Sequence, residues 1–350
     1  MTLAPLFIVG TGRCGSTLLS ELVRAHPRLL SVSEFFSTAT DLGGRIAACF
    51  PEHPVEAAEL WRLVGGPAPR LGAMLRHDVA MDEVLYRREQ SRFSPELGVP
   101  AILHVTLPHL TSQPDAIFDE LAQLVAALPR GSAGEFYERL FGRLAERFGH
   151  DRWVERSGGS LRLIRRLCAA FPGARFVHLV RDGRNCAISM SRHLGFRMAL
   201  VSMALTEILG VDPWESADRT FESDLSDELA AFLPERFDPA AFLAYSTPLP
   251  LCGHYWSGEI LAGLAELAEV APERRLTLRY EDFLAAPRLT IARLFEFLEA
   301  PAEAAWLDRA AATVRPARSQ WTALPERDRQ ALHDACGPGF AALGELYAES

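Results

Sequence analysis

A short glycine-rich stretch near the start of the chain holds an arginine, a cysteine and two hydroxyl side chains: Gly12-Arg13-Cys14-Gly15-Ser16-Thr17. Glycines allow a tight turn that points several backbone N–H groups at one anion. Arg13 adds a planar, permanently charged set of donors, and Ser16 and Thr17 add hydroxyl donors. These residue types suit the binding of phosphate or sulfate.

The flanking sequence predicts the elements that position this stretch. The apolar run Leu6 to Val9 predicts a strand, and an apolar-periodic run to about Ala25 predicts a helix. Such a helix places unpaired N–H groups and the positive end of its dipole at the loop. Gly10 and Gly15 have the P-loop spacing G-x-x-x-x-G-K-[ST], but Ser16 replaces the lysine. An ordinary strand-to-helix turn stays open as an alternative at this point.

Further strand–helix pairs follow along the chain and predict an α/β fold with a central parallel sheet flanked by helices in three layers. The predicted strands after the first are Leu29–Val32, Arg152–Glu155, Arg175–Val180 and Arg275–Leu278. We expect a single domain over residues 1–350, with large helical insertions. Residues 51–150 form one insertion, expected to build an acceptor pocket or lid, and residues 201–250 form a second, acidic one.

Ligands of open parallel sheets bind at the carboxyl ends of the strands. Three predicted strand ends carry polar groups, at Gly10 to Thr17, Glu155 to Ser160 and Arg181 to Asn185. We expect the arginines of the second and third groups to converge with Arg13 on one polyanion.

The charge of the chain is negative and unevenly spread. Its 350 residues carry a net charge of −9 and include no lysine, so every basic side chain is an arginine. Between Val201 and Pro250, ten acidic residues outweigh two arginines, so this segment holds −8 of the total. The remainder is nearly neutral and allows a locally basic anion site. A basic tail or basic-aromatic stripe is missing, which argues against nucleic acid binding.

Cysteine usage and hydropathy predict a cytoplasmic protein. The six cysteines are scattered without a C-x-x-C pair, and we expect them to be reduced core residues. Residues 1–5 have no charged region typical of a signal peptide. No apolar segment is long enough to span a bilayer.

Several segments together resemble the sulfotransferases that use 3′-phosphoadenosine-5′-phosphosulfate (PAPS). The glycine-rich loop resembles their 5′-phosphosulfate loop, P-[KR]-S-G-T-T. The segment Phe176 to Ser189 resembles their 3′-phosphate segment, in which an arginine and a serine eight residues later hold the 3′-phosphate. Arg279-Tyr280-Glu281-Asp282-Phe283, followed by Pro287, resembles their Y-E-D-L…P signature.

Two weaker matches occur in the same order as in the family. Trp153 to Ser157 resembles W-x-x-K-[TS]-P, with Arg156 for the lysine and Gly158 for the proline. Arg318-Ser319-x-Trp321 resembles the C-terminal pattern. Glycine also replaces a proline usual in the family at Gly12 and at Gly183.

The resemblance implies a P-loop NTPase-like fold, a sulfotransferase activity, PAPS as donor with 3′,5′-adenosine bisphosphate (PAP) as product, and no metal. It implies catalytic roles for Glu34, Arg13 and Arg156. The donor would be held by Gly12, Arg13, Cys14, Gly15, Ser16, Thr17, Arg181, Ser189, Arg318 and Ser319.

The acceptor needs a base, and Glu34 is the first candidate. Carboxylate members of the family carry a pattern like H-P-x(5–6)-E, and His26-Pro27 is followed here by Glu34. Its alternative role is that of a helix N-cap or a surface carboxylate. His104 and His109 are the second candidates for the base, although His104 in its apolar run is more typical of a packed side chain.

The acceptor itself is a small molecule, a carbohydrate, a lipid or a peptide. The acidic segment could bind a cationic acceptor, but we expect a solvated helical insertion.

Two other functions stay open. A P-loop kinase or NTPase needs the missing lysine and an aspartate that holds Mg²⁺, for which Asp182 is the candidate. A non-catalytic relative would bind a nucleotide without turnover, but Arg13, Glu34, Arg181 and Ser189 argue for an enzyme.

Overall fold

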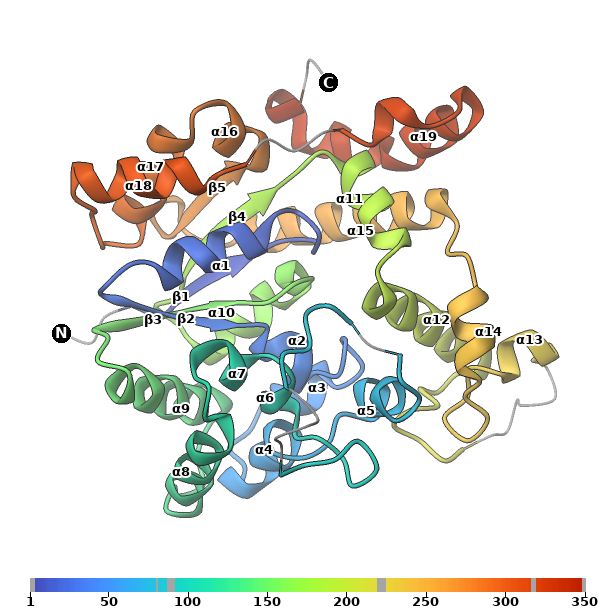
Figure 1. The fold of residues 1–350 in the computed structure, drawn as a ribbon, viewed down its shortest axis with the longest axis horizontal. Helices are drawn as coiled ribbons and strands as arrows, with labels where there is room; N and C mark the ends of the chain where they lie inside the picture. Colours follow the sequence, from blue (N-terminus) through green and yellow to red (C-terminus); the bar gives the residue numbers. More distant parts are fainter. Residues whose placement is uncertain (1–3, 80, 87–91, 219–224, 316–318, 348–350) are drawn as a thin grey trace. The chain divides into compact units, whose positions relative to one another are not determined.

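The computed structural model describes residues 4–79, 81–86, 92–218, 225–315 and 319–347. Five strands form one sheet in the order β2-β3-β1-β4-β5, and every neighbouring pair is parallel (Figure 1). The strands are β1 (Leu6–Val9), β2 (Leu29–Ser33), β3 (Arg152–Arg156), β4 (Arg175–Val180) and β5 (Arg275–Arg279). All five were predicted from their apolar runs, and each boundary agrees within one residue.

The parallel sheet with its flanking helices confirms the predicted α/β fold of the P-loop NTPase-like type. β1 is apolar and buried at every position, as a central strand covered on both faces must be. Because the strands are parallel, the segments that follow Val9, Ser33, Arg156 and Val180 all begin at one edge of the sheet.

The chain divides into two compact units. Unit 1 comprises Met1–Ser33, Glu138–Met190 and Pro248–Ser350, and unit 2 comprises Glu34–Tyr137 and Ser191–Thr247. Two helices, α9 (Ala133–Arg147) and α11 (Gly183–Ser191), cross a boundary between the units along the chain. The single domain expected from the sequence stays a prediction.

Unit 1 contains the whole sheet. Its other helices are α1 (Ser16–Arg24), η2 (Ser160–Leu163), α10 (Ile164–Ala170), α15 (Leu249–Ala268), η4 (Pro272–Arg274), α16 (Tyr280–Ala285), α17 (Pro287–Phe297), α18 (Ala304–Thr313), η5 (Trp321–Ala323), α19 (Glu326–Leu343) and η6 (Gly344–Tyr347).

The two faces of the sheet in unit 1 are covered differently. On one face Ser20 of α1 and Ser31 of β2 join their hydroxyls at 2.9 Å. On the other face Phe7 of β1 packs against Trp153 and Phe171, with ring centroids 5.6 and 5.1 Å apart. The alternation of side chains along each strand produces this division, since Ser31 pairs with Val154 and not with Trp153.

Unit 2 is helical within its described residues, as the pattern of residues 51–150 predicted. Its remaining helices are α2 (Phe35–Ala39), α3 (Ile46–Cys49), α4 (Ala57–Val64), α5 (Pro69–Arg76), α6 (Ala101–His104), α7 (Thr106–Leu110), α8 (Pro114–Ala126), α12 (Leu194–Leu209), α13 (Asp227–Ala230) and α14 (Pro239–Ala244).

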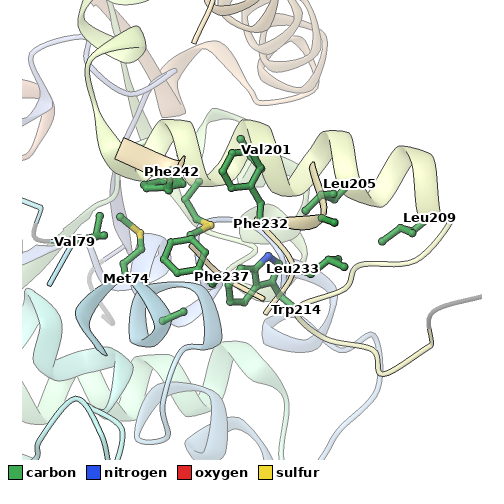
Figure 2. Close-up of a cluster of buried hydrophobic side chains, with 13 residues drawn as sticks. Met74, Val79, Val201, Leu205, Leu209, Trp214, Phe232, Leu233, Phe237 and Phe242 are labelled. Atoms are coloured by element: carbon green, nitrogen blue, oxygen red, sulfur yellow. The ribbon is translucent and has the colours of Figure 1, made fainter. Parts of the chain in front are cut away.

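The acidic segment contributes to a hydrophobic core of unit 2. Trp214, Phe232, Phe237 and Phe242 are buried there together with Met74 of α5 (Figure 2). The expectation of a solvated insertion is therefore wrong for these residues. The net charge of the segment gives no sign of its aromatic residues. They lie among the acids in the sequence, but their side chains pack into the core of unit 2.

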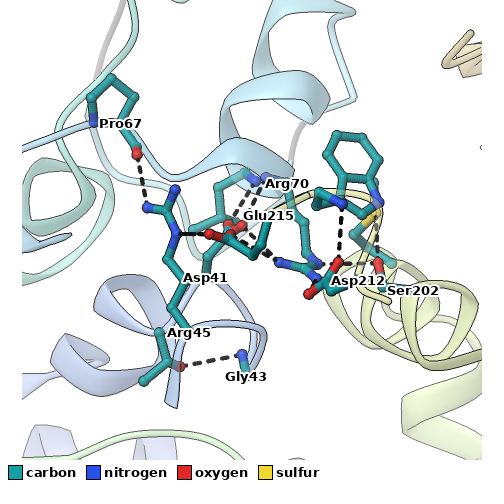
Figure 3. A network of polar contacts seen from close by, with 12 residues as sticks. Asp41, Gly43, Arg45, Pro67, Arg70, Ser202, Asp212 and Glu215 are labelled. Atoms are coloured by element: carbon teal, nitrogen blue, oxygen red, sulfur yellow. Dashed lines mark hydrogen bonds and ion pairs between the residues drawn. The ribbon is translucent and has the colours of Figure 1, made fainter. Parts of the chain in front are cut away.

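Part of the acidic charge is neutralised inside unit 2. The buried Arg70 guanidinium pairs with Asp41 at 3.1 Å and contacts Asp212, and Glu215 accepts from Arg45 at 2.7 Å (Figure 3). Burial raises the pKa of Glu215, which Arg45 opposes. Two of the acids counted in the sequence, Asp212 and Glu215, are therefore ion-pair partners of arginines within unit 2.

The six cysteines are free thiols, and only Cys168 is not fully buried, as expected for reduced core residues. None of the helices in the described ranges has the length and apolar character needed to cross a membrane.

Candidate functional site

The loop between β1 and α1 has a backbone shaped by left-handed residues. Gly12, Arg13 and Gly15 have φ values of 78°, 54° and 96°. Glycine adopts this conformation freely, whereas for Arg13 it costs about 1 kcal/mol. Left-handed residues of this kind turn successive N–H groups toward one point, and α1 begins at Ser16 directly after them.

Arg13, Ser189 and Arg181 meet at the ends of β1 and β4, within unit 1. The Arg13 Nε donates to Ser189 Oγ at 3.0 Å, and the Arg181 Nη1 donates to the Arg13 carbonyl at 3.1 Å. All three side chains are half-buried. Arg181 of the third predicted group therefore lies beside Arg13, together with Ser189, and their binding of one polyanion stays a prediction.

Tyr280 also belongs to this cluster, although no role was predicted for its side chain from the sequence. Its ring lies 4.7 Å beneath the Arg181 guanidinium, a cation–π distance. A Cβ on Gly15 would collide with the same ring. Tyr280 therefore supports both the loop and Arg181. It was visible in the sequence only as part of the Y-E-D signature.

Arg156 lies at the next strand ends. It is 4% exposed, and its Nη2 donates to Ser33 Oγ at 2.6 Å, which joins the carboxyl ends of β3 and β2. Its charge is close enough to the loop to act on the Cys14 thiol. Its neighbour Glu155 is fully buried and accepts from Ser157 Oγ at 2.5 Å.

The remaining loop residues differ in their exposure. Cys14 is buried, and burial raises the pKa of its thiol. Its Sγ fills the space beside Gly10, where an added Cβ would lie 2.7 Å away, so Cys14 has only its backbone to offer an anion. Ser16 is half-buried and Thr17 is exposed, and both lie in the first turn of α1.

A cavity of about 610 Å³ opens beside Thr17. It lies between α1 and α18 of unit 1 and is walled mainly by apolar side chains. The lining residues are Thr17, Leu18, Glu21, Leu22 and Ala25 of α1 and its end, and Trp306, Arg309, Ala310 and Thr313 of α18.

Glu34 belongs to unit 2 and follows Ser33, the last residue of β2, in the chain. Its φ of 56° is left-handed, as for Arg13. It occupies the N-cap position of α2, but its side chain makes no capping hydrogen bond. Its Oε2 instead accepts from Ser37 Oγ at 2.5 Å, and the residue is half-buried. Glu34 therefore takes the N-cap position named as its alternative, without a side-chain capping hydrogen bond.

The two candidate histidines, His104 and His109, differ in their environments, and His178 resembles the first. His104 is fully buried in unit 2, neither ring nitrogen has a hydrogen-bond partner among the described residues, and burial lowers its pKa to about 4. His109 is half-buried in α7. His178 in β4 is buried like His104, and burial lowers its pKa to about 4.

His193 lies between two helices, because α11 ends at Ser191 and α12 begins at Leu194. His193 caps α12, since its Nδ1 accepts from the Phe196 N–H at 3.2 Å, while its Nε2 lies 2.8 Å from Glu83.

The carboxylate of Asp182, the candidate Mg²⁺ ligand of a kinase, makes an ion pair and hydrogen bonds within the chain. It pairs with Arg184 at 2.5 Å and accepts from the N–H groups of Arg184 and Asn185, at the start of α11. Within the described ranges, no three His, Cys, Asp or Glu side chains gather in a way that could hold a metal ion.

The C-terminal segment reaches the same helix. Ser319 is exposed, and its Oγ donates to Asn185 Oδ1 at 3.3 Å. Arg318 lies outside the described residues. The structure thus brings together the loop, Arg181, Ser189 and Ser319 within unit 1, on or beside α11 and the end of β1.

A comparison of this chain with known protein families identifies the family to which it belongs. A model described as the sulfotransferase family matches residues 5–244. Among curated proteins, none matches the chain.

Three solved structures are similar over most of their lengths. The sulfotransferase domain from the curacin biosynthetic pathway is 15% identical, with a TM-score of 0.43 over 95% of this chain and 91% of that one. The sulfotransferase domain of the Synechococcus PCC 7002 olefin synthase is 17% identical, with a TM-score of 0.44 over 95% and 87%. Sulfotransferase STF9 from Mycobacterium avium is 15% identical, with a TM-score of 0.44 over 97% and 78%.

Proposed function

Because the chain belongs to the sulfotransferase family, we propose that it transfers a sulfuryl group from PAPS to a hydroxyl or amine acceptor. The observation that carries the proposal is the convergence of Arg13, Arg181 and Ser189 at the ends of β1 and β4. A phosphate-binding loop of an ordinary NTPase needs a lysine at its end, and the cation here is an arginine inside the loop.

The donor set fits a ligand with two separate anionic groups. PAPS, when bound, supplies an activated sulfuryl group together with a phosphate that can leave. The N–H groups from Gly12 to Thr17, the hydroxyls of Ser16 and Thr17, and the Arg13 guanidinium are all suited to stabilise negative charge as it develops on that phosphate. No metal ion is required for this role in the proposal.

Arg181 and Ser189 would hold the 3′-phosphate. A guanidinium binds phosphate oxygens through two parallel donors, and the ring of Tyr280 limits the rotation of Arg181. The cavity beside Thr17 is a suitable place for the adenosine, because its walls are largely apolar and it shares Thr17 with the loop.

Glu34 would remove the proton of the acceptor. The hydrogen bond from Ser37 orients its carboxylate, the group that would accept the proton. In the chain it directly follows Ser33, the last residue of β2. His109 stays the alternative base. His104 is a poorer one, since it is fully buried within unit 2.

Arg156 would contact the transferring sulfuryl group. Its bond to Ser33 Oγ fixes the guanidinium at the ends of β2 and β3. The acceptor in this proposal is a small molecule, carbohydrate, lipid or peptide, bound with the help of residues 51–150.

The test is calorimetric titration with PAP, and with ATP plus Mg²⁺, of the wild type and Arg181→Ala. We expect metal-independent PAP binding that weakens at least about 100-fold in Arg181→Ala, because a charge-assisted bidentate contact is lost. Arg165→Ala is the matched control, since Arg165 is an 85% exposed side chain elsewhere in unit 1.

Two results would contradict the proposal. A preference for Mg·ATP would favour the kinase, despite the contacts that occupy Asp182. PAP binding without sulfuryl transfer to any acceptor in a broad screen, and with unchanged product in cells after Glu34→Gln, would favour the non-catalytic relative.

A further inference from the structure

The segment that follows residue 318 is fastened to α11 by side chains to which the proposed function assigns no role. Asn185 Oδ1 accepts from the Gln320 N–H at 3.0 Å and from Ser319 Oγ at 3.3 Å. The next residue, Trp321, lies over Arg184, with the guanidinium carbon 4.8 Å from the ring centroid. Two adjacent residues of α11 therefore hold three adjacent residues of the C-terminal segment.

The Arg184 guanidinium is held from several sides. It pairs with Asp182 at 2.5 Å, and both side chains are only 11% and 12% exposed. The ring of Phe340 from α19 lies 5.1 Å from its guanidinium carbon, in addition to that of Trp321. A cation between two rings and a carboxylate, largely out of water, is a strong and directional contact. It gives Trp321 a defined position.

Asn185 and Ser189 are four residues apart on α11, so they lie on one face of that helix, one turn apart. Ser189 contacts Arg13, and Asn185 contacts Ser319. The hydroxyls of Ser319 and Ser189 therefore follow one another along this face, toward the loop after β1.

We propose that Asn185 and the Arg184–Trp321 stack are positioning residues. Through the Gln320 N–H and the Trp321 ring they keep Ser319 beside the face of α11 that carries Ser189, and the Ser319 hydroxyl turns its one hydrogen from Asn185 Oδ1 to the 3′-phosphate when the donor binds. This inference rests on the proposed function, because it assumes that Ser189 and Arg181 bind that phosphate. It adds residues that touch no substrate and act through the placement of Ser319. The chemistry they serve is recognition of a ribose 3′-phosphate monoester.

The consequence is a selectivity that can be measured without turnover. PAP and 5′-AMP differ only in the 3′-phosphate, so the ratio of their dissociation constants isolates recognition of that group. A residue with a merely structural role would change both affinities together or neither. A positioning residue would lower the PAP affinity and leave that of 5′-AMP unchanged.

The experiment is calorimetric titration of PAP and 5′-AMP into the wild type, Trp321→Leu, Trp321→Phe and Asn185→Ala. We expect Trp321→Leu and Asn185→Ala to weaken PAP binding about tenfold each and to change 5′-AMP binding less than about twofold. Trp321→Phe keeps a ring over Arg184 and should restore most of the PAP affinity. Trp61→Leu, in α4 of unit 2, is the matched control for loss of an indole.

The outcomes separate this inference from the function on which it rests. If the wild type prefers PAP to 5′-AMP, but Trp321→Leu and Asn185→Ala keep the full preference, the positioning role is overturned and the proposed function stands. If the wild type itself shows no preference for PAP, the proposed function fails and this inference fails with it. Asn185→Ala removes two hydrogen bonds of a half-buried side chain, so it tests the point even if Trp321→Leu does not fold.

Discussion

Two residues with proposed catalytic roles, Arg13 and Glu34, have left-handed backbones, with φ of 54° and 56°. Each follows the end of a strand in the sheet, β1 and β2 respectively. Non-glycine residues adopt this conformation at a cost of about 1 kcal/mol each, and such residues concentrate where function requires a particular direction of the side chain. The shared conformation motivates a test of Glu34 and a test of the loop that holds Arg13.

Glu34→Gln should abolish turnover and preserve donor binding. The amide keeps the shape of the side chain but cannot accept a proton, so we expect kcat to fall by about 10² to 10⁴. The dissociation constant for PAP should change less than about twofold, because the donor residues lie in unit 1. Product formation and calorimetry measure the two effects. Glu52→Gln, an exposed carboxylate of unit 2, is the control. Full activity in Glu34→Gln would shift the role of base to His109.

Gly15→Ala should destroy the anion loop. Alanine is strained at a φ of 96°, and its Cβ would collide with the Tyr280 ring. We expect loss of PAP binding and a destabilisation of about 1–3 kcal/mol, measured by calorimetry and urea unfolding. Gly337→Ala in α19 is the matched control, since nothing lies within 4 Å of its added Cβ, and it should be neutral or stabilising. Normal PAP affinity in Gly15→Ala would refute the role of the loop.

At the scale of elements, the strands were the most predictable part. Each is a short segment with apolar residues at several of its positions that leads into a turn or a helix, so local pattern located it. The edge where Arg13 and Arg181 meet followed from the parallel order of the strands. The contacts of Asn185 with Gln320 span 135 residues, and no local pattern reports such a contact. Tyr280 beneath Gly15 was missed for the same reason.

The ion pairs of Arg70 in unit 2 could not be predicted from the sequence either. Arg70 contacts Asp41 and Asp212, which are 29 and 142 residues away in the chain. Asp41 is fully buried and also accepts from the N–H groups of Arg70 and Leu71. Charged residues counted along a sequence are expected to lie at the surface. Only the fold shows which acids pair with an arginine within unit 2.

Arg70→Met should destabilise unit 2 strongly. It leaves the Asp41 carboxylate buried without its cation, and removal of one partner from a buried pair costs about 3–5 kcal/mol. Urea unfolding measures the loss. Arg288→Met is the control, because its pair with Asp308 is more than half exposed and should contribute less than about 1 kcal/mol.

A double variant separates the buried charge from the packing around it. Asp41→Asn removes the charge that Arg70→Met leaves behind, so the loss in the double variant should be smaller than the sum of the single losses. Strict additivity would contradict the assignment of the cost to an unpaired carboxylate.

At the scale of the whole molecule, two histidines have no exposed surface, His178 in unit 1 and His104 in unit 2. Burial lowers the pKa of each to about 4, below the usual value of 6.5. Between these values the unfolded chain binds a proton that the folded chain does not bind. Stability is therefore complete above about pH 6.5 and falls as the pH is lowered toward 4.

Each of these histidines should make the free energy of unfolding about 2 kcal/mol lower at pH 5 than at pH 7.5. Replacement by leucine removes the titrating group, so His178→Leu and His104→Leu should each lose less stability over that range than the wild type. Urea unfolding at the two pH values measures the difference. His254→Leu, at an exposed position of α15, should keep the wild-type dependence. An unchanged slope in His178→Leu would show that this group does not titrate as its burial requires.

Because the proposed anion-binding groups of Arg13 and Arg181 are guanidinium groups, the heat of PAP binding should have a particular dependence on the buffer. A lysine in the same place would exchange protons with the solvent near its usual pKa, whereas a guanidinium keeps its proton at every pH at which a protein is folded. At pH 9 the phosphates of PAP are fully ionised as well. The measured heat of PAP binding should then be the same in buffers with very different heats of ionisation, since the complex forms without a proton entering or leaving.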